Sequence, residues 1–448
     1  MKTTKFFFMA ALALMTAACS SNDDELIQQP VEQPANNMIT ITAKLAPKSS
    51  SAQTRAMNES GGNIVVDWAQ NEQLQIISAN GHTATANIDN VTSGTATISF
   101  SIDAAAVGQN CTIVYPASAA TTTGVKAYAA NTALTAQDGT LKYDIDVRVG
   151  AGTISASNPG TMAVTTQPEA QYSIFKFTLQ DLSAADKSAT EFKVSDGSGN
   201  VMTTVTSGSA SGELYVALPV MAAGTYWFNA TIDSKPYIAK ATTAAATVAG
   251  KYYQTTVKMA TIGDVILDDG KFAVRTSTGT KVAMIAYLGN DAETSPTNTA
   301  FKNGLALALG DVSGTQRWCS QTNATCLGTQ YDTSTMFNDL AGIANTDALV
   351  NHTGHTHAAA SAARGYNSGT HPAGTSVWFL PSAGQWEKML TAAGSYSNLR
   401  TNAGLQSADY WSSTEYSSSH ACYCDFNNGT RSHVGKDFNF RVRACLAF

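Results

Sequence analysis

Short segments in which apolar and polar residues alternate recur over residues 38–261, and they confine this part of the chain to β structure. Clusters of Gly, Asn, Asp and Ser separate the segments, and no apolar stripe of helical period lies between them. The clearest segment is MITITAKLAP, whose apolar face is formed by Ile39, Ile41, Ala43 and Leu45. The spacing of these segments predicts a mainly β chain with β-sandwich architecture.

The length and the net charge of the chain limit the number of domains and the classes of partner that it can have. The chain has 448 residues, which is enough for two or three domains. Only 13% of the residues are charged and the net charge is -6, so no basic surface is available to neutralise a nucleic-acid backbone. We therefore expect no nucleic-acid partner.

The first residues are typical of an exported protein. Lys2 and Lys5 precede an apolar run over residues 6–18, which is too short to span a bilayer. Small residues and Cys19 follow, an arrangement that looks like a bacterial lipobox, in which the cysteine receives the lipid. We expect an exported lipoprotein held at the outer membrane through Cys19; an ordinary cleaved signal is the alternative. Residues 20–37 are polar and acidic, as in a flexible tether.

A polar loop follows the first predicted strand. It contains Arg55 among small residues, and exposed loops of this composition are preferred sites of proteolysis. The composition therefore predicts a loop that is sensitive to proteases. The alternative is that Arg55 is only a solvated loop residue.

Residues 19–260 resemble the fimbrillin family, the subunits of type V pili. The resemblance rests on the order of the lipobox, ITITAKLAP, TRA, VDWAQNEQLQI, IVYPAS, ALPV and GKYYQTTVKM. It implies two stacked β-sandwich subdomains, which we place at residues 56–165 and 166–261. It also implies cleavage between Arg55 and Ala56 by an arginine-specific protease, which would remove residues 20–55 with the first strand. Assembly with other pilus subunits would follow, each of which adds a strand to the open groove of its neighbour.

Residues 262–448 have a different composition, with frequent Trp, His and Cys. WFLPSAGQWEKM and YWSSTEYS resemble the C-type-lectin-like fold of the bacterial adhesin and sulfatase-modifying branch. We expect an α+β head domain here. Ser382 and Gln385 have the spacing of a capping box and predict a helix that begins after Ser382, with Trp386 and Leu390 in the core. A second helix is expected over residues 358–363, and CYCDF and FNFRVRACLAF are expected as the closing strands.

Three histidines stand within six residues, at His352, His355 and His357. Imidazoles at this spacing can bind zinc or copper, but the surrounding Thr and Gly predict no rigid geometry. We expect a solvated loop with no metal, and we expect no cofactor elsewhere.

Five cysteines fall in the last third of the chain. An exported protein permits disulfides, so we favour disulfides over redox or metal chemistry for Cys319, Cys326, Cys422, Cys424 and Cys445. The odd number leaves at least one of them outside a disulfide within the domain. Alternation in the last strand places Cys445 on the polar side with Arg441 and Arg443.

No motif supports catalysis. GxSxG, HExxH and phosphate-binding glycine loops are absent from the sequence, and Cys422 and Cys424 do not have the arrangement of the sulfatase-modifying thiols. The calcium-binding phrases of animal C-type lectins are also missing. We do not expect an enzyme, although an oxidase of the sulfatase-modifying type remains an alternative.

These observations together favour a fimbrial subunit at or near the pilus tip whose head mediates adhesion. The apolar face of the last strand, from Phe438 to Phe448, predicts that it belongs to the head's own core and is not given to a neighbour. The expected partner on the target surface is an unidentified glycan or protein, with Glu415, Tyr416 and His420 as candidate contacts and residues 352–357 as a second site. A structural stalk or anchor subunit without a ligand is the alternative.

Overall fold

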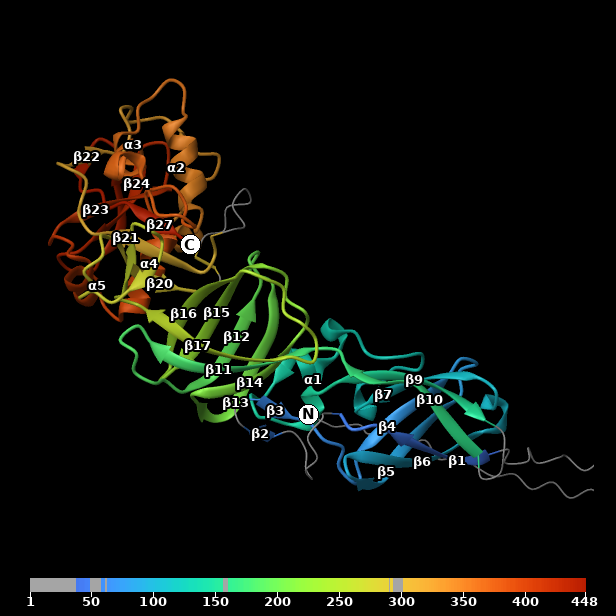
Figure 1. Ribbon diagram of the computed structural model, residues 1–448. Coiled ribbons are helices and arrows are strands. Elements are labelled where there is room, and N and C mark those ends of the chain that lie inside the picture. Colours follow the sequence, from blue (N-terminus) through green and yellow to red (C-terminus); the bar gives the residue numbers. More distant parts are fainter. Residues whose placement is uncertain (1–37, 49–57, 61–62, 156–159, 290, 293–300) are drawn as a thin grey trace, which may run out of the picture.

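The computed structural model describes residues 38–48, 58–60, 63–155, 160–289, 291–292 and 301–448. Three parts follow one another along the chain and give an elongated molecule (Figure 1). The first two are built of strands and the third combines strands with helices, so the mainly β prediction with an α+β C-terminal part is confirmed.

The first part is a closed barrel where a sandwich was expected. Its strands lie in the order β1, β10, β9, β7, β4, β5, β6. Their bounds are β1 (Met38–Leu45), β4 (Gln73–Ser78), β5 (Thr83–Thr92), β6 (Thr95–Asp103), β7 (Asn110–Tyr115), β9 (Arg148–Ser155) and β10 (Gly160–Ala170). A separate hairpin is formed by β2 (Asn58–Ser60) and β3 (Asn63–Val65). Inward-facing residues of the barrel strands fill one apolar core, as the period of two along each strand requires.

The second part is an eight-stranded sheet in the order β14, β11, β17, β16, β15, β12, β13, β8. Seven of its strands contribute to one core in which Phe175, Phe177, Phe192 and Phe228 pack together, so the sheet curls around its own apolar face. The strands are β8 (Ala136–Gln137), β11 (Ser173–Asp181), β12 (Ala189–Ser195), β13 (Val201–Ser211), β14 (Glu213–Leu218), β15 (Gly224–Ile232), β16 (Lys235–Thr243) and β17 (Tyr252–Thr261).

The first two parts share residues across the expected boundary. β10 continues through residues 165 and 166 as a barrel strand, and β8 pairs with β13 although it lies earlier in the chain than β9. The short helix α1 (Thr132–Thr135) precedes β8. A further apolar cluster joins the two parts and includes Val66, Val114, Leu134, Ile174 and Ala217.

The third part contains a five-stranded sheet in the order β19, β18, β20, β21, β27 and a three-stranded sheet of β23, β24 and β25; β22 pairs with β26. The strands are β18 (Val265–Leu267), β19 (Phe272–Ala273), β20 (Lys281–Leu288), β21 (Gly304–Ala308), β22 (Gln316–Arg317), β23 (Asp409–Glu415), β24 (His420–Asp425), β25 (Arg431–Gly435), β26 (Asn439–Phe440) and β27 (Cys445–Ala447). The helices are α2 (Gly342–Val350), α3 (Ala358–Arg364), α4 (Ala383–Ala393) and α5 (Tyr396–Ala403). Short 3-10 turns are η1 (Ala104–Ala106), η2 (Ala117–Ala119), η3 (Tyr128–Ala130), η4 (Tyr143–Ile145), η5 (Met336–Asn338) and η6 (Tyr366–Gly369).

The capping box at the start of α4 is confirmed. Ser382 Oγ accepts a hydrogen bond from the Gln385 amide, and the Gln385 side chain accepts one from the Ser382 amide. Trp386 and Leu390 lie in the core as predicted, and α3 forms where a second helix was expected.

The expected final strand is broken, and only residues 442–448 are buried on both faces, which corrects the prediction of a polar side. Phe438, which was expected on the apolar face, is 51% exposed because the chain enters the core only after Arg441. Ala444, Leu446 and Phe448 belong to one apolar cluster, whereas Cys445 and Ala447 belong to another. Arg443 is also buried, and its guanidinium pairs with Asp311 and donates to backbone carbonyl oxygens. The reason is that β27 lies between two packed layers, so neither of its faces meets solvent.

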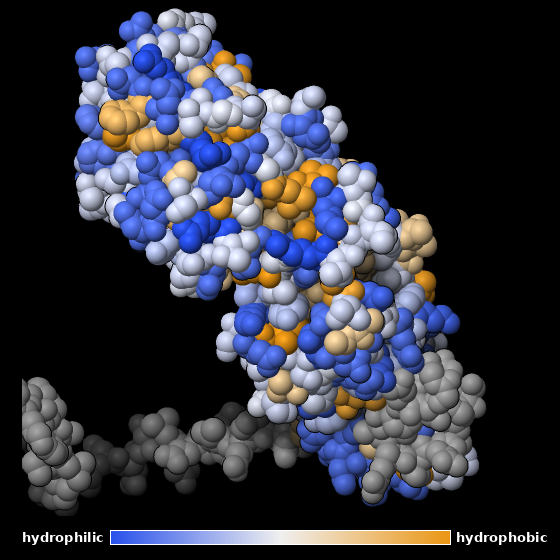
Figure 2. Space-filling view, turned by 90° about the vertical axis from the view of Figure 1, so that its left-hand side faces the viewer, coloured by the Kyte–Doolittle hydropathy of each residue, from blue (hydrophilic) through white to orange (hydrophobic). Residues whose placement is uncertain are grey.

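The outer surface is mixed in polarity. On the face shown in Figure 2, hydrophobic residues form separate patches among hydrophilic ones. Within the described residues, no helix has the length and hydropathy needed to cross a bilayer.

Candidate functional site

β1 holds the barrel closed between β6 and β10. Eight residue pairs join it to β6 in antiparallel register, from Met38 opposite Asp103 to Leu45 opposite Ala96. Only two pairs, at Ile41 and Thr42, join it to β10 in parallel register. Ile41 and Leu45 are fully buried in the barrel core. The strand is therefore anchored along one edge and by its inward-facing side chains, and it has few backbone pairs along the other edge.

Lys48 anchors the chain just beyond β1. Its Nζ lies 3.4 Å from Asp146 Oδ2 and 3.9 Å from Glu72 Oε2, and it stands over the rings of Trp68 and Tyr115 at 4.1 and 3.5 Å from their centroids. Burial lowers the pKa of Lys48 to about 8, although Asp146 and Glu72 act in the opposite direction. Asp146, Glu72, Trp68 and Tyr115 form a cage around the Lys48 ammonium group. Sequence reasoning missed it because its members come from separate parts of the chain.

The expected lipid and processing residues, Cys19, Arg55 and Ala56, lie outside the described residues. The predicted lipidation and cleavage therefore stay predictions.

Glu415 is not an exposed ligand contact, which corrects the prediction. Its side chain is fully buried at the end of β23, where it forms an ion pair with the equally buried Lys436. Its carboxylate also accepts hydrogen bonds from the amides of Cys326 and Leu327. Lys436 Nζ donates in addition to the carbonyl oxygens of Ala324 and Ser418. The carboxylate is buried because β23 passes through the interior of this part.

Tyr416 and His420 lie together, with a third ring that sequence analysis did not select. Tyr416 stacks on His433 with ring centroids 3.6 Å apart, and His420 meets the same ring edge-on at 5.4 Å. The Tyr416 hydroxyl lies 3.2 Å from Thr333 Oγ1. All three rings are partly exposed, so they can meet a ligand. Burial and the neighbouring His420 both lower the pKa of His433.

The histidine loop is not simply solvated. His352 stacks on His355 at 5.1 Å and meets the ring of His357 at 5.3 Å, and His357 is only 1% exposed. Burial and the neighbouring His352 lower the pKa of His357 to about 4, so the ring is neutral at pH 7. Sequence reasoning missed that Cys319 and Cys326 approach this histidine: the three ligand atoms lie within 4.8 Å of one another.

None of the six cysteines among the described residues forms a disulfide. Cys319 and Cys326 do meet, with their Sγ atoms 3.8 Å apart. Cys422 contacts the sulfur of Met336, whereas Cys424 packs in the cluster that also contains Cys445. Burial raises the pKa of both Cys422 and Cys424 to about 12, so neither is a reactive thiolate at pH 7.

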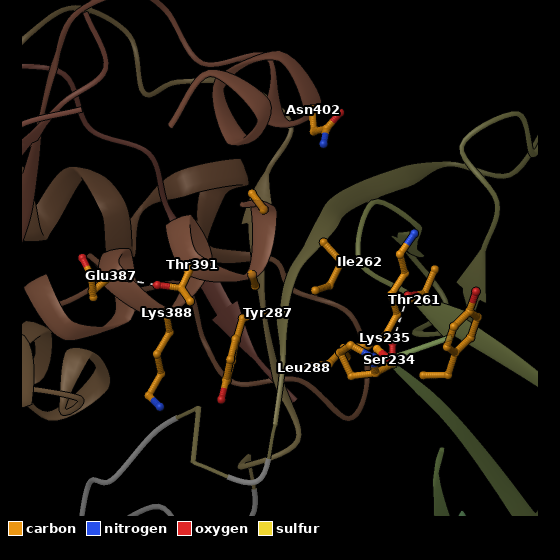
Figure 3. Close-up of a pocket in the computed structure, with 14 residues that line it drawn as sticks. Ser234, Lys235, Thr261, Ile262, Tyr287, Leu288, Glu387, Lys388, Thr391 and Asn402 are labelled. Atoms are coloured by element: carbon orange, nitrogen blue, oxygen red, sulfur yellow. Dashed lines mark hydrogen bonds between the residues drawn. The ribbon is translucent and has the colours of Figure 1, made fainter. Parts of the chain in front are cut away.

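A cleft of about 740 Å³ lies between the second and third parts (Figure 3). Ser234, Lys235, Thr261 and Ile262 line one wall, and Tyr287, Glu387, Lys388 and Thr391 line the other. Lys388 pairs with Asp291, whose carboxylate also accepts from the Tyr287 hydroxyl. Glu387 pairs with Arg431, so both charged side chains of this second wall have an ionic partner outside the cleft lining.

Comparisons with known proteins give structural likenesses only. No family model matches the chain, and no curated protein matches it. A fimbrial protein from Bacteroides ovatus aligns over 92% of this chain and 99% of its own, with 16% identity and a TM-score of 0.32. A C-terminally truncated tip fimbrial protein from Porphyromonas gingivalis aligns over 50% of this chain and 98% of its own, with 7% identity and a TM-score of 0.24. The chain is thus similar in part to fimbrial proteins, at low sequence identity.

Proposed function

We propose that this protein is a fimbrial subunit whose first strand is removed by proteolysis and replaced by a strand from a neighbouring subunit. The observation that carries the proposal is the place of β1, which closes the barrel and precedes the loop that contains Arg55. A cut in that loop leaves β1 held by non-covalent contacts alone.

Loss of β1 would create a site for an extended segment. The edges of β6 and β10 would present unpaired backbone groups, and the pockets of Ile41 and Leu45 would open into the core. An incoming strand with apolar residues at alternate positions restores both the backbone pairs and the core. The two-pair contact with β10 leaves that edge accessible to an incoming segment before β1 has left β6.

The strand that ends the third part is unsuited to donation. Phe448 is 1% exposed, and its backbone exchanges hydrogen bonds with Gly304 and accepts one from Asn303. Releasing β27 would expose apolar residues of two clusters at once. We therefore place the subunit at or near the pilus tip, where it accepts a strand and gives none.

We further propose that residues 262–448 are a lectin-like head that mediates adhesion. The surface around Tyr416, His420 and His433 offers partly exposed rings and hydroxyl groups, which suit a polar glycan or protein ligand. Glu415 is excluded from this surface by its burial. Before cleavage, the lipid on Cys19 would hold the subunit at the outer membrane.

A reversible cross-link tests the removal of β1. Thr42 and Ser99 stand opposite each other on β1 and β6, and Thr42 is exposed. Directly opposed residues of antiparallel strands have the separation that a disulfide needs. We expect a Thr42→Cys/Ser99→Cys variant to be cut normally, to retain β1 and to fail to enter pili. Reduction should restore entry, and each single cysteine variant should behave as the wild type.

Two results would refute the proposal. Entry of the oxidised, cross-linked variant into pili would show that β1 does not have to leave. Normal entry of an Arg55→Ala variant would show that the cut after Arg55 is not needed.

A further inference from the structure

Two cysteines and a histidine from separate loops meet in the interior of the third part. Cys319 is fully buried, Cys326 is 9% exposed and His357 is 1% exposed. Their ligand atoms all lie within 4.8 Å of one another. Cys319 and Cys326 flank a loop that follows β22, and His357 immediately precedes α3. The chain thus brings three metal-ligating groups together across more than one loop.

The histidine in this cluster lacks the partners that a buried imidazole needs. Neither Nδ1 nor Nε2 of His357 has a hydrogen-bond partner among the described residues, and both atoms are inaccessible to solvent. A buried polar group without a partner costs roughly 1–3 kcal/mol. Coordination of a metal ion by one ring nitrogen would give that nitrogen the partner it lacks.

The separation of the two thiols fits a shared metal ion. Zinc binds sulfur at about 2.3 Å, so two sulfurs at a tetrahedral angle stand about 3.8 Å apart. The Sγ atoms of Cys319 and Cys326 are 3.8 Å apart, which is far longer than the roughly 2.05 Å of a disulfide bond. Without a metal, the same separation leaves only a weak hydrogen bond between the two thiols.

His352, which lies next to His357, is a candidate for a fourth ligand. The ring of His352 contacts the ring of His357, and His352 Nδ1 also has no hydrogen-bond partner among the described residues. His352 and His357 are separated by four residues, a spacing found in structural zinc sites. A turn of the His352 side chain toward the two sulfurs would complete a Cys₂His₂ set.

The surroundings also suit a metal thiolate. The amide of Gln321 donates a hydrogen bond to Cys319 Sγ at 3.3 Å, and such bonds stabilise a thiolate ligand. The buried Glu415 fixes the Cys326 amide, so the loop that carries this thiol is held in place. One divalent ion with two thiolates is neutral, and the adjacent Lys436 and Glu415 are also neutral as a pair. The burial of the whole group therefore leaves no net charge uncompensated.

We propose that Cys319, Cys326, His357 and His352 form a structural zinc site that joins the loop before α3 to the loop after β22. Four protein ligands leave no open position, so the site is closed to substrate and serves stability. It supports the base of the Tyr416 surface, because Lys436 receives backbone hydrogen bonds from Trp318 and Cys319. This inference does not depend on the fimbrial function proposed above.

Metal content tests the proposal on the full-length protein. Protein purified under reducing conditions without chelator and then incubated with Zn²⁺ should retain one zinc ion per chain after gel filtration. Cys319→Ser, Cys326→Ser and His357→Gln should each lose most of that zinc. Cys422→Ser and His371→Gln are matched controls because these residues lie outside the cluster, and they should retain it.

Cobalt(II) substitution provides a second readout that does not require a folded variant. The wild-type protein loaded with Co²⁺ should show the intense visible absorption of tetrahedral cobalt together with a thiolate charge-transfer band, and Zn²⁺ should displace both. A chelator should lower the melting temperature of the third part in the zinc-loaded protein.

Several outcomes would overturn the zinc site. They are the absence of zinc or cobalt uptake by reduced, folded wild-type protein, an unchanged zinc content in the His357→Gln variant, or an octahedral cobalt spectrum without a thiolate band. A Cys319–Cys326 disulfide that forms in the presence of excess zinc would equally refute it.

Discussion

Replacing Ile41 and Leu45 with alanine should loosen β1 once the chain is cut between β1 and β2. Both side chains are fully buried in the barrel core. Truncating a buried Ile or Leu to Ala costs about 2–5 kcal/mol. The two positions are about 13 Å apart along a strand, at roughly 3.3 Å per residue, so their effects should add. Together the two substitutions should weaken the binding of β1 to the barrel by about 4–10 kcal/mol.

In the cut protein β1 is a separate strand, so the lost free energy appears as weaker binding of β1 to the barrel. At 1.4 kcal/mol per tenfold, the dissociation constant of β1 should rise by about 10³ to 10⁷. The assay is to cut the purified protein with an arginine-specific protease and add an excess of a labelled peptide of residues 38–48. The rate at which the label enters the barrel reports the release of the original strand.

The matched control changes the exposed face of the same strand. Thr42 and Lys44 are exposed, so Thr42→Ala/Lys44→Ala should exchange at nearly the wild-type rate. Equal exchange rates for the core double variant and this control would refute the reasoning, since they would show that burial in the barrel core does not hold β1.

Three further predictions concern stability. Lys436→Met leaves the buried Glu415 carboxylate without its cation and should destabilise the third part by about 3–5 kcal/mol. Adding Glu415→Gln to this variant should recover part of the lost stability. Urea unfolding followed by tryptophan fluorescence measures both effects. The folded pKa of Lys48 is about 8, against an ordinary value of 10.5, so the unfolded chain binds more protons between these pH values. Barrel stability should therefore rise from pH 8 to 10 by about 2 kcal/mol. Lys48→Met should abolish the rise, and above pH 10 the raised pKa of Tyr115 should reverse it. Ser382→Ala removes the cap of α4 and should cost about 1 kcal/mol in thermal unfolding, with Ser395→Ala at α5 as a comparison cap.

Local features were predictable because their signals reach only a few residues. The alternation in β1 correctly placed Ile41 and Leu45 inward, and the Ser382 and Gln385 pair marked the start of α4. Each rests on a period of two or on contacts three residues apart, which the sequence displays directly.

Features built from distant residues could not be predicted in the same way. Alternation placed Arg443 and Cys445 on a polar side, but both are buried. Cys445 lies in β27 between two packed layers, and Arg443 is buried with its ionic partner Asp311. Glu415 follows a polar phrase typical of a loop, yet its partner Lys436 allows it to be buried.

By itself, the sequence determined the β character of residues 38–261, the inward face of β1 and the capped helix of the third part. Only the tertiary structure decided that β1 closes a barrel, that Lys48 enters a cage and that Cys319, Cys326 and His357 meet. The physical reason is that strand pairing and side-chain burial depend on which distant segments pack together, and no local pattern of residues specifies those neighbours.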